Sequence, residues 1–459
     1  MCEFKSMGRI WNGDRRVVGE SIDAQGLRKW RCRNVTNVLH ASLLLCGVVL
    51  SGCGNATPAT PMPSNGGTVR TYQGVSNMIQ ATYGALGSVP SWSLVLSSTE
   101  SSFRHNDAYS SDVLPVTGTY SSDNGYLLLT SSGQPPAGEG QGYSLVLPGE
   151  AALLRPGDST FAPVIAADME SCPAIKNNET FLFVALPGLF WNNATSAAYG
   201  TVQAATDTTG VSWSFSSQSQ SLLTGSGSPP SYPTSFSGTC GQGINGYNIG
   251  YGISILPTAK TPYYSPTISV SPGGLFTESA TGAAVTNINA PNNYPQQPLV
   301  GVAAPSSALD TNGLAAGKYL GFMYQSLPNS NSADQTQTTQ LISFGTITPG
   351  AGTTMTGGVF PKDDPSQMPA TNVVVNLGAQ SASQNGLYTG VRVTMPDTST
   401  VAGTCAKYGG SPGMTAGGSL TCSFPAVAVA GNPDNKFVIF LIGQNPIQQA
   451  PFGLYLYQQ

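Results

Sequence analysis

Charged residues and long apolar runs are both scarce in this sequence. Asp, Glu, Lys and Arg make up 9% of the 459 residues, against about 25% in typical globular proteins. Ser, Thr, Asn and Gln must therefore supply most of the polar surface. The apolar stretch of residues 38–50 is shorter than the about 20 residues that a transmembrane helix needs. It is too short to span a membrane.

Basic residues are not concentrated in the main part of the chain. Of the 18 basic residues 8 precede Cys53, and of the 22 acidic residues 4 do, which leaves 10 basic and 18 acidic residues after it. The chain beyond Cys53 therefore carries a net charge of about −8. A surface that binds nucleic-acid phosphates needs grouped Lys and Arg, so nucleic-acid binding is not expected.

The sequence offers little for nucleophilic catalysis. His105 is the only histidine after Cys53, and a Ser-His-Asp arrangement would have to use it with Asp107. No GxSxG motif supplies the serine. The segment around His105 is interpreted as a polar loop.

Two acidic segments could bind a metal ion, but neither has a complete pattern. Residues 310–313 begin like a calcium-binding loop and lack the later Glu. Asp363 and Asp364 could ligate Ca²⁺ or act as paired carboxylates, yet the prolines on either side of them favour a solvated turn. We therefore expect no metal ion and no other cofactor.

Four of the eight cysteines lie at or before Cys53, and four remain for the folded body. An even number in an exported protein favours two disulfides, for which three connectivities exist. We predict Cys172 with Cys240 and Cys405 with Cys422, because the second pair flanks a Gly-rich segment typical of a hairpin loop. Zinc is the weaker alternative, since no CxxC spacing is present.

The N-terminal region has the order of parts found in an export signal. Basic residues at 28–33 precede the apolar stretch of residues 38–50, which has the length of a signal-peptide core. The stretch ends in Leu50-Ser51-Gly52-Cys53. This arrangement resembles the signal peptide and lipobox of bacterial lipoproteins. The segment before Arg28 is longer than export requires, so we expect translation to begin nearer Met7 or Leu27.

The lipoprotein resemblance implies a covalent anchor. It implies cleavage between Gly52 and Cys53 and attachment of a diacylglyceryl group to the Cys53 sulfur, with several acyl chains such as palmitate in the mature protein. Multiple chains make membrane attachment effectively permanent. Gly54 stands where some lipoproteins carry an Asp that signals retention at the inner membrane, so the resemblance favours the outer membrane, facing either the periplasm or the outside.

The remaining sequence predicts an all-β fold. Its 55 Gly and 34 Pro interrupt nearly every apolar run within about ten residues, and the runs are rich in Val, Ile, Tyr and Phe. Alternation such as that in residues 211–215 favours sheets with one buried and one polar face. A short amphipathic helix is predicted around residues 75–86, and two paired strands are predicted in residues 436–459.

Four segments of the second half of the chain echo segments of the first half in the same order, with offsets of 135 to 145 residues. Collinear matches at similar offsets indicate a weak internal duplication. The cysteines do not repeat, which is a departure from a strict repeat. The matched segments are residues 161–168 with 296–305, 180–187 with 318–325, 198–202 with 343–347, and 245–257 with 385–396.

The duplication suggests two tandem antiparallel β-sandwiches or up-and-down barrels, and a β-propeller is the alternative. The predicted organisation is an export region with the lipobox, a flexible Pro/Thr/Gly tether, a first β-rich unit and a second β-rich unit. Their boundaries are 1–53, 54–67, 68–260 and 261–459.

These features predict a lipid-anchored cell-envelope protein that binds a partner or serves a structural role and is not an enzyme. The Tyr and Trp residues could line a glycan-binding face, and a protein ligand is equally open. Trp92 and Trp213 alternate with serines, so we expect them to point into the core instead. A hydrolase of envelope or extracellular polysaccharide is the alternative function, with carboxylates drawn from separate loops.

Overall fold

The structure is a computed structural model of the whole chain. Its described residues belong to the second of two compact units, Ala56–Gln459. They comprise residues 299–327, 336–345 and 353–459 apart from residue 449, together with the strands between residues 69 and 278 and a few of the turns that join them. The tether, the lipobox and the rest of the export region lie outside the described residues.

The first eight strands form a closed antiparallel barrel in which each strand pairs with the next in sequence and β8 pairs with β1. One of its hairpins shows how the sequence sets the turns. Asn124 and Gly125 join β4 to β5, both with positive φ, which is the geometry of a tight two-residue hairpin. The strands of this first barrel are β1 (Val69–Ser76), β2 (Ser91–Ser97), β3 (Ser102–Asp107), β4 (Val116–Asp123), β5 (Tyr126–Ser131), β6 (Gln141–Leu147), β7 (Ala151–Arg155) and β8 (Val164–Asp168).

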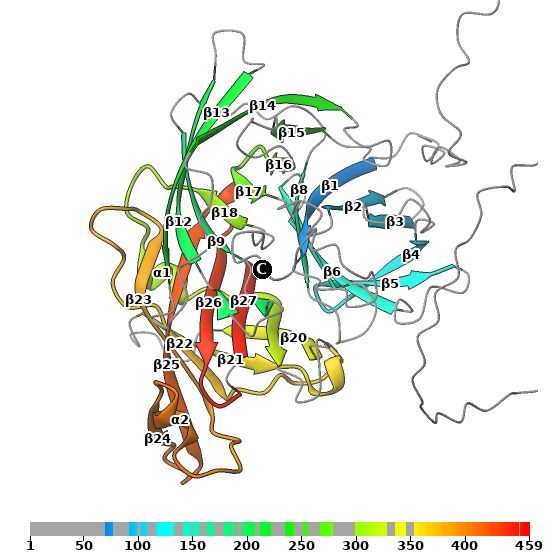
Figure 1. Cartoon of the computed structure of the whole chain (residues 1–459). Helices are drawn as coiled ribbons and strands as arrows, with labels where there is room; N and C mark the ends of the chain where they lie inside the picture. Colours follow the sequence, from blue (N-terminus) through cyan, green and yellow to red (C-terminus); the bar gives the residue numbers. More distant parts are fainter. Residues whose placement is uncertain are drawn as a thin grey trace, which may run out of the picture. The chain divides into compact units, whose positions relative to one another are not determined.

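The second barrel also has eight antiparallel strands, and β18 pairs with β9 to close it (Figure 1). The hairpin expected at residues 207–210 is confirmed by the pairing of β12 with β13. A separate two-stranded ladder is made by β10 (Gly188–Leu189) and β11 (Thr195–Ser196). The barrel strands are β9 (Glu179–Ala185), β12 (Ala198–Thr206), β13 (Ser212–Ser221), β14 (Ser235–Gln242), β15 (Tyr251–Ile255), β16 (Thr267–Val270), β17 (Leu275–Glu278) and β18 (Leu299–Ala303).

The last nine strands form a third sheet, and the extra pairing of β23 with β25 closes it into a third barrel. The two C-terminal strands pair as expected, and β27 also pairs with β19. The chain therefore ends inside a sheet. The strands are β19 (Tyr319–Leu327), β20 (Thr336–Gly345), β21 (Thr354–Val359), β22 (Val373–Asn376), β23 (Leu387–Pro396), β24 (Ser411–Met414), β25 (Leu420–Gly431), β26 (Val438–Asn445) and β27 (Ala450–Gln458).

Helices are short in the described residues. They are α1 (Thr311–Ala315), α2 (Thr404–Lys407) and the 3-10 turns η1 (Pro361–Asp363) and η2 (Pro433–Asn435). None of the helices in this part of the chain has the length and apolar character needed to span a bilayer. The helix predicted around residues 75–86 is wrong at its start, because Val75 lies in β1, and its later residues lie outside the described part.

The all-β prediction is confirmed, and the sheets are up-and-down barrels. The structure has three such barrels, whereas two units were expected from the sequence. The boundary expected between residues 260 and 261 falls inside the second barrel, since β15 and β16 lie on either side of it and pair with each other. The two echoed halves of the sequence suggested a division at this point, but backbone pairing continues across it.

The four echoed segments occupy equivalent places in their barrels, as a duplication requires. The echoed strands β8 and β18 are each the last strand of a barrel, and β9 and β19 are each the first. Similarly, β12 and β20 are second strands. The fourth pair, β15 and β23, are both fifth strands. The repeating unit is therefore one eight-stranded barrel of about 140 residues.

Buried side chains on both faces of the sheets distinguish this fold from the one-sided pattern that was expected. Along β19, Tyr319 and Met323 pack into the core of the third barrel, while Phe322 and Tyr324 between and beside them pack into a larger shared core. The expectation of one buried and one polar face is wrong here, because the barrels bury their outer faces against one another. The shared core combines Tyr72 and Tyr126 of the first barrel, Leu182 and Val302 of the second, and Phe322 and Tyr455 of the third.

Candidate functional site

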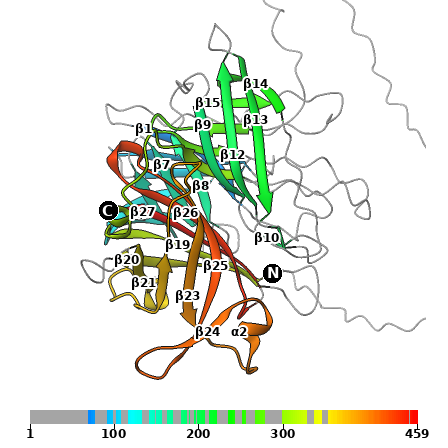
Figure 2. The ribbon, with the colours of Figure 1, turned by 90° about the vertical axis from the view of Figure 1, so that its left-hand side faces the viewer.

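A hairpin extends the third barrel beyond its other strands. It comprises the segment that follows β23, helix α2, strand β24 and the start of β25, and we call residues 397–423 the braced hairpin. Figures 1 and 2 both show this segment projecting at the lower end of the sheet. Met414 and Leu420 are direct partners across its β24–β25 ladder. The hairpin loop expected between Cys405 and Cys422 is therefore confirmed.

A disulfide joins Cys405 of α2 to Cys422 of β25, as the sequence predicted. Both cysteines are fully buried. A Cβ on Gly410 would lie 2.5 Å from the Cys422 sulfur and 2.6 Å from the Cys405 sulfur, so only glycine lets the chain pass over the bridge. Helix and ladder are thus fixed to each other at the base of the projection. Cys240 lies in β14, but Cys172 and the side chain of Cys240 lie outside the described part, so the Cys172–Cys240 pair stays a prediction.

Removing this disulfide is expected to loosen the braced hairpin without unfolding the barrels. The Cys405→Ser/Cys422→Ser double variant opens a loop whose closure stabilises by about 3 kcal/mol in the chain-entropy model. Amide hydrogen exchange of residues 397–423 should accelerate, while that of β26 and β27 stays as in the wild type. Unchanged exchange in the hairpin would contradict a bracing role.

The braced hairpin presents most of the large apolar side chains that the described part of the chain exposes. Five such side chains are exposed in that part, and four of them are in this hairpin. The fifth, Met368, lies in the loop between η1 and β22. Isolated exposed apolar residues are normal, whereas a group of them marks an interaction surface. The four are Val401 (67% exposed), Tyr408 (40%), Met414 (66%) and Leu420 (58%).

The charges around this apolar group are positive. No Asp or Glu occurs between residues 398 and 433, and Lys407 is the only basic residue in that range. The Lys407 ammonium lies 5.0 Å from the centre of the Tyr408 ring. Beside them, Arg392 of β23 donates hydrogen bonds to the hydroxyls of Ser411 and Ser423. Residues 398–423 therefore carry one positive charge and no negative charge, while Asp397 at the base brings the braced hairpin as a whole to zero, in a chain of net charge −4.

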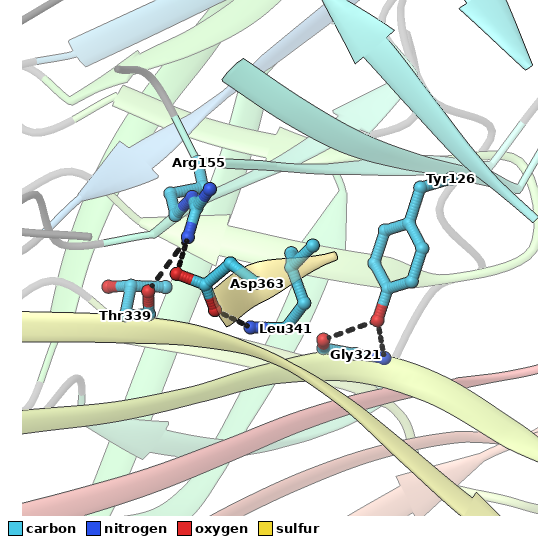
Figure 3. A network of polar contacts seen from close by, with 6 residues as sticks. All are labelled: Tyr126, Arg155, Gly321, Thr339, Leu341 and Asp363. Carbon is cyan, nitrogen blue, oxygen red and sulfur yellow. Dashed lines mark hydrogen bonds and ion pairs between the residues drawn. The ribbon is translucent and has the colours of Figure 1, made fainter. Parts of the chain in front are cut away.

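A polar joint connects the first barrel to the third (Figure 3). Arg155, at the end of β7, forms an ion pair of 2.8 Å with Asp363 of η1 and donates to the Thr339 carbonyl at 3.1 Å. The other Asp363 carboxylate oxygen accepts from the Leu341 backbone N–H at 3.1 Å. Register places Arg155 opposite Tyr143, whose ring lies 5.2 Å from the guanidinium. Arg155 therefore contacts residues of both the first and the third barrel.

Tyr126 forms the second part of the joint. Its hydroxyl donates toward the carbonyls of Gly321 (2.9 Å) and Ile342 (2.8 Å) and accepts from the Gly321 N–H (3.2 Å). Burial raises the pKa of Tyr126 far above its ordinary value, so the hydroxyl keeps its proton. Its ring contacts those of Phe322 and Phe360. This residue therefore joins two barrels by both hydrogen bonds and packing.

Backbone strain accompanies the ion pair. Lys362 and Asp363 have φ of 56° and 54°, a region that non-glycine residues adopt at a cost. The two hydrogen-bonded carboxylate oxygens hold Asp363 in this conformation. The sequence marked Asp363 and Asp364 as a possible carboxylate pair, but the structure gives them separate partners, since Asp364 binds Ser366 and Gln367.

A second joint connects the first and second barrels through Glu150. Its carboxylate accepts from the Ser271 hydroxyl and the Gly273 N–H, both at 2.6 Å. Burial raises the pKa of Glu150 above its usual range, these two hydrogen bonds oppose the shift, and the nearby carboxylates of Asp434 and Asp168 add to it. The carboxylate is therefore less stable here than in water.

The Glu150→Gln variant should gain stability relative to the wild type as the pH rises. Because the folded pKa of Glu150 is raised, its stabilising contribution is complete below its ordinary pKa and is lost as the pH rises through the folded pKa. Gln keeps an acceptor for both donors and does not ionise. Urea unfolding at about pH 4 and about pH 8 measures the difference, and a difference that is equal at both pH values would contradict the raised pKa.

The other residues that the sequence marked as candidates cap a helix or lie in strands. Asp310 caps α1 by accepting from the Asn312 N–H at 3.1 Å, so residues 310–313 begin a helix. No group of three or more potential metal ligands occurs among the described residues. His105 lies in β3, not in a loop, and Trp92 and Trp213 lie in strands β2 and β13. The side chains of these three residues lie outside the described part.

Neither Arg155 nor Tyr126 was expected from the sequence to connect parts of the fold. A single Arg ending the apolar strand of residues 151–155 is the signal that could have marked the first. Nothing in the local sequence marks the second, because its partners lie 195 and 216 residues away.

Comparison with known proteins yields distant structural similarity only. No family model and no curated protein matches the sequence. One solved structure with some similarity is a variant of the vaccine antigen transferrin-binding protein B from Haemophilus parasuis, at 9% identity over 86% of this chain and 76% of that one, with a TM-score of 0.21. Another is intact transferrin-binding protein B, with both lobes, at 10% identity over 85% and 77% and a TM-score of 0.17. Similarities of this size assign the chain to no family.

Proposed function

We propose that this chain is a lipid-anchored, non-enzymatic protein of the cell envelope that binds its partner through the braced hairpin. The observation that carries the proposal is the grouping of four exposed apolar side chains on one disulfide-fixed projection. A surface of this kind is enriched in Tyr and Met and depleted of acidic residues, as the centres of binding interfaces are.

The three barrels support binding by holding the hairpin rigidly. The shared core and the Arg155–Asp363 and Glu150–Ser271 contacts join the barrels to one another. The buried disulfide fixes the projection to the third barrel. A surface that is already ordered loses little conformational entropy when it binds, so a small apolar group can contribute useful affinity.

The anchor is proposed from the sequence of the export region. Residues 28–33 orient the peptide, residues 38–50 enter the bilayer, and Cys53 receives the lipid. The outer membrane is the proposed location, on the resemblance to bacterial lipoproteins.

Changing Cys53→Ser should leave an unprocessed precursor that takes up no labelled fatty acid. The thiol is the atom that carries the lipid in the proposed reaction, and serine cannot form the thioether. Cys46→Ser is the matched control, because it lies in the same export region and should be processed normally. Mass spectrometry of the wild-type membrane fraction should show a lipidated Cys53 as the first residue, and an intact Gly52–Cys53 bond would contradict the anchor.

Site-specific photocrosslinking tests the binding surface. A benzophenone amino acid placed at Leu420 in living cells should form adducts that the same group at Met368 does not. Both positions are exposed, so Met368 controls for random collisions. Equal adduct yields at the two positions would contradict the braced hairpin as the binding surface.

A further inference from the structure

We infer that the end of the braced hairpin inserts into the surface of a bilayer with anionic headgroups. The inference rests on the proposed function and names the occupant of its binding surface. Met414 and Leu420 face each other across the last pairs of the ladder, and both are mostly exposed. A narrow end with paired aliphatic side chains suits entry into the headgroup and acyl boundary of a membrane.

Two further exposed residues of the braced hairpin match the chemistry of that boundary. Tyr408 and Lys407 are adjacent and in contact, and both residue types favour membrane interfaces, where the ring is partly buried and the ammonium reaches the headgroups. The absence of acidic residues between 398 and 433 removes repulsion from lipid phosphates. The rest of the mature chain is acidic, whereas residues 398–423 contain Lys407 and no acidic residue, so this part of the hairpin is the part that an anionic surface attracts.

The backbone at the hairpin end is largely paired within itself, which lowers the cost of leaving water. The turn at residues 415–419 closes with hydrogen bonds from the Thr415 and Gly418 N–H groups, both 2.9 Å. The Gly410 N–H donates to the Cys405 carbonyl at 2.8 Å. Pro412, in the outer strand β24, has no N–H to leave unpaired.

The small size of the surface favours a membrane over a protein partner. A specific protein interface buries about 800 Å² on each partner, and four partly exposed side chains on a single hairpin offer much less. The proposed anchor removes the need for such an area. Cys53 lies 16 residues before the start of β1 at Val69, a length that reaches at most roughly 55 Å, so the membrane is always present at high effective concentration.

Methionine oxidation by aqueous peroxide tests the inference on the full lipidated chain. Met414 and Met368 are both exposed, so they should oxidise at similar rates in water. With the chain anchored in vesicles containing phosphatidylglycerol, Met414 should oxidise about tenfold more slowly than Met368, which corresponds to insertion most of the time. Peptide mass spectrometry gives both rates in one sample, with Met368 as the internal control.

Two variants separate insertion from simple shielding. Leu420→Ser and Lys407→Glu should each bring the Met414 rate close to that of Met368, and vesicles of phosphatidylcholine alone should give weaker protection of Met414 in the wild type. Equal rates for the two methionines on phosphatidylglycerol vesicles would overturn the inference.

The outcomes also distinguish this inference from the proposed function. Equal oxidation rates on vesicles combined with protein adducts from position 420 in cells would overturn membrane insertion and leave the binding hairpin standing. A chain that fails to float with the vesicles would overturn the anchor and this inference together, whereas flotation without Met414 protection overturns insertion alone.

Discussion

Replacing Tyr126 by Ala is expected to lower the free energy of unfolding by about 4 kcal/mol, a loss typical of deleting a large buried aromatic ring. The side chain is fully buried and its ring contacts those of Tyr143, Phe322 and Phe360. Removing it leaves a cavity between two barrels that the closed sheets cannot fill by collapsing. Urea unfolding followed by circular dichroism measures the change.

The Tyr126→Phe variant distinguishes the contribution of the hydroxyl to stability from that of the ring. This variant should cost about 2 kcal/mol, because the Gly321 N–H and the carbonyls of Gly321 and Ile342 lose a partner while buried. Tyr143→Phe is the matched control on the same face of the first barrel, since this partly buried Tyr is not part of the hydroxyl network, and it should change stability by less than about 0.5 kcal/mol. Similar losses for the two Phe variants would show that the hydroxyl contacts do not matter.

Replacing Arg155 by Met should lower the free energy of unfolding by about 3 kcal/mol, because it leaves Asp363 without its counter-charge. The Arg155 side chain is 5% exposed and that of Asp363 is 21% exposed. Solvent reaches Asp363 in part, which places the loss at the lower end of the range for breaking a buried pair. Met retains most of the buried apolar stem, so the measured loss reports the charge and its hydrogen bonds.

A double-mutant cycle tests this explanation of the Arg155 effect. Asn at 363 tolerates the positive φ and can still accept from the Leu341 N–H, so Asp363→Asn removes the charge and keeps the turn. The double variant Arg155→Met/Asp363→Asn should be more stable than Arg155→Met alone, since no unpaired charge remains. Strictly additive losses would contradict coupling between the two side chains.

Local sequence patterns predicted a large part of this fold. Short Val- and Tyr-rich runs between glycines and prolines predicted strands, and the C-terminal runs predicted a paired end in β26 and β27. The pairing of Cys405 with Cys422 was also predictable, because the two cysteines flank a short Gly-rich segment and the bridge closes a local loop. The echoed segments revealed the repeat because strands in equivalent places of a repeated barrel keep a similar pattern.

The number of barrels was not predictable in the same way. A closed barrel and an open sheet have the same strand pattern, and closure depends on the pairing of the first strand with the last, as in β9 with β18. The expected boundary at residue 260 followed from dividing the chain into two repeated halves, and such a division carries no information about pairing. The exposed apolar group on the braced hairpin was also missed, because Met414 and Leu420 look like ordinary strand residues until the surroundings of the hairpin are known.

The sequence by itself determined the strand content, the order of the echoed segments, the local disulfide and the predicted lipid anchor. Each of these depends on residues close together in the chain or on the period of a repeat. Tertiary structure alone decided which sheets close, why both faces of β19 are buried, and where Arg155 and Tyr126 act. Their partners lie about 200 residues away, and a hydrogen bond across that separation leaves no trace in the local pattern. Burial depends on what packs against a side chain, and that is settled only when the three barrels meet.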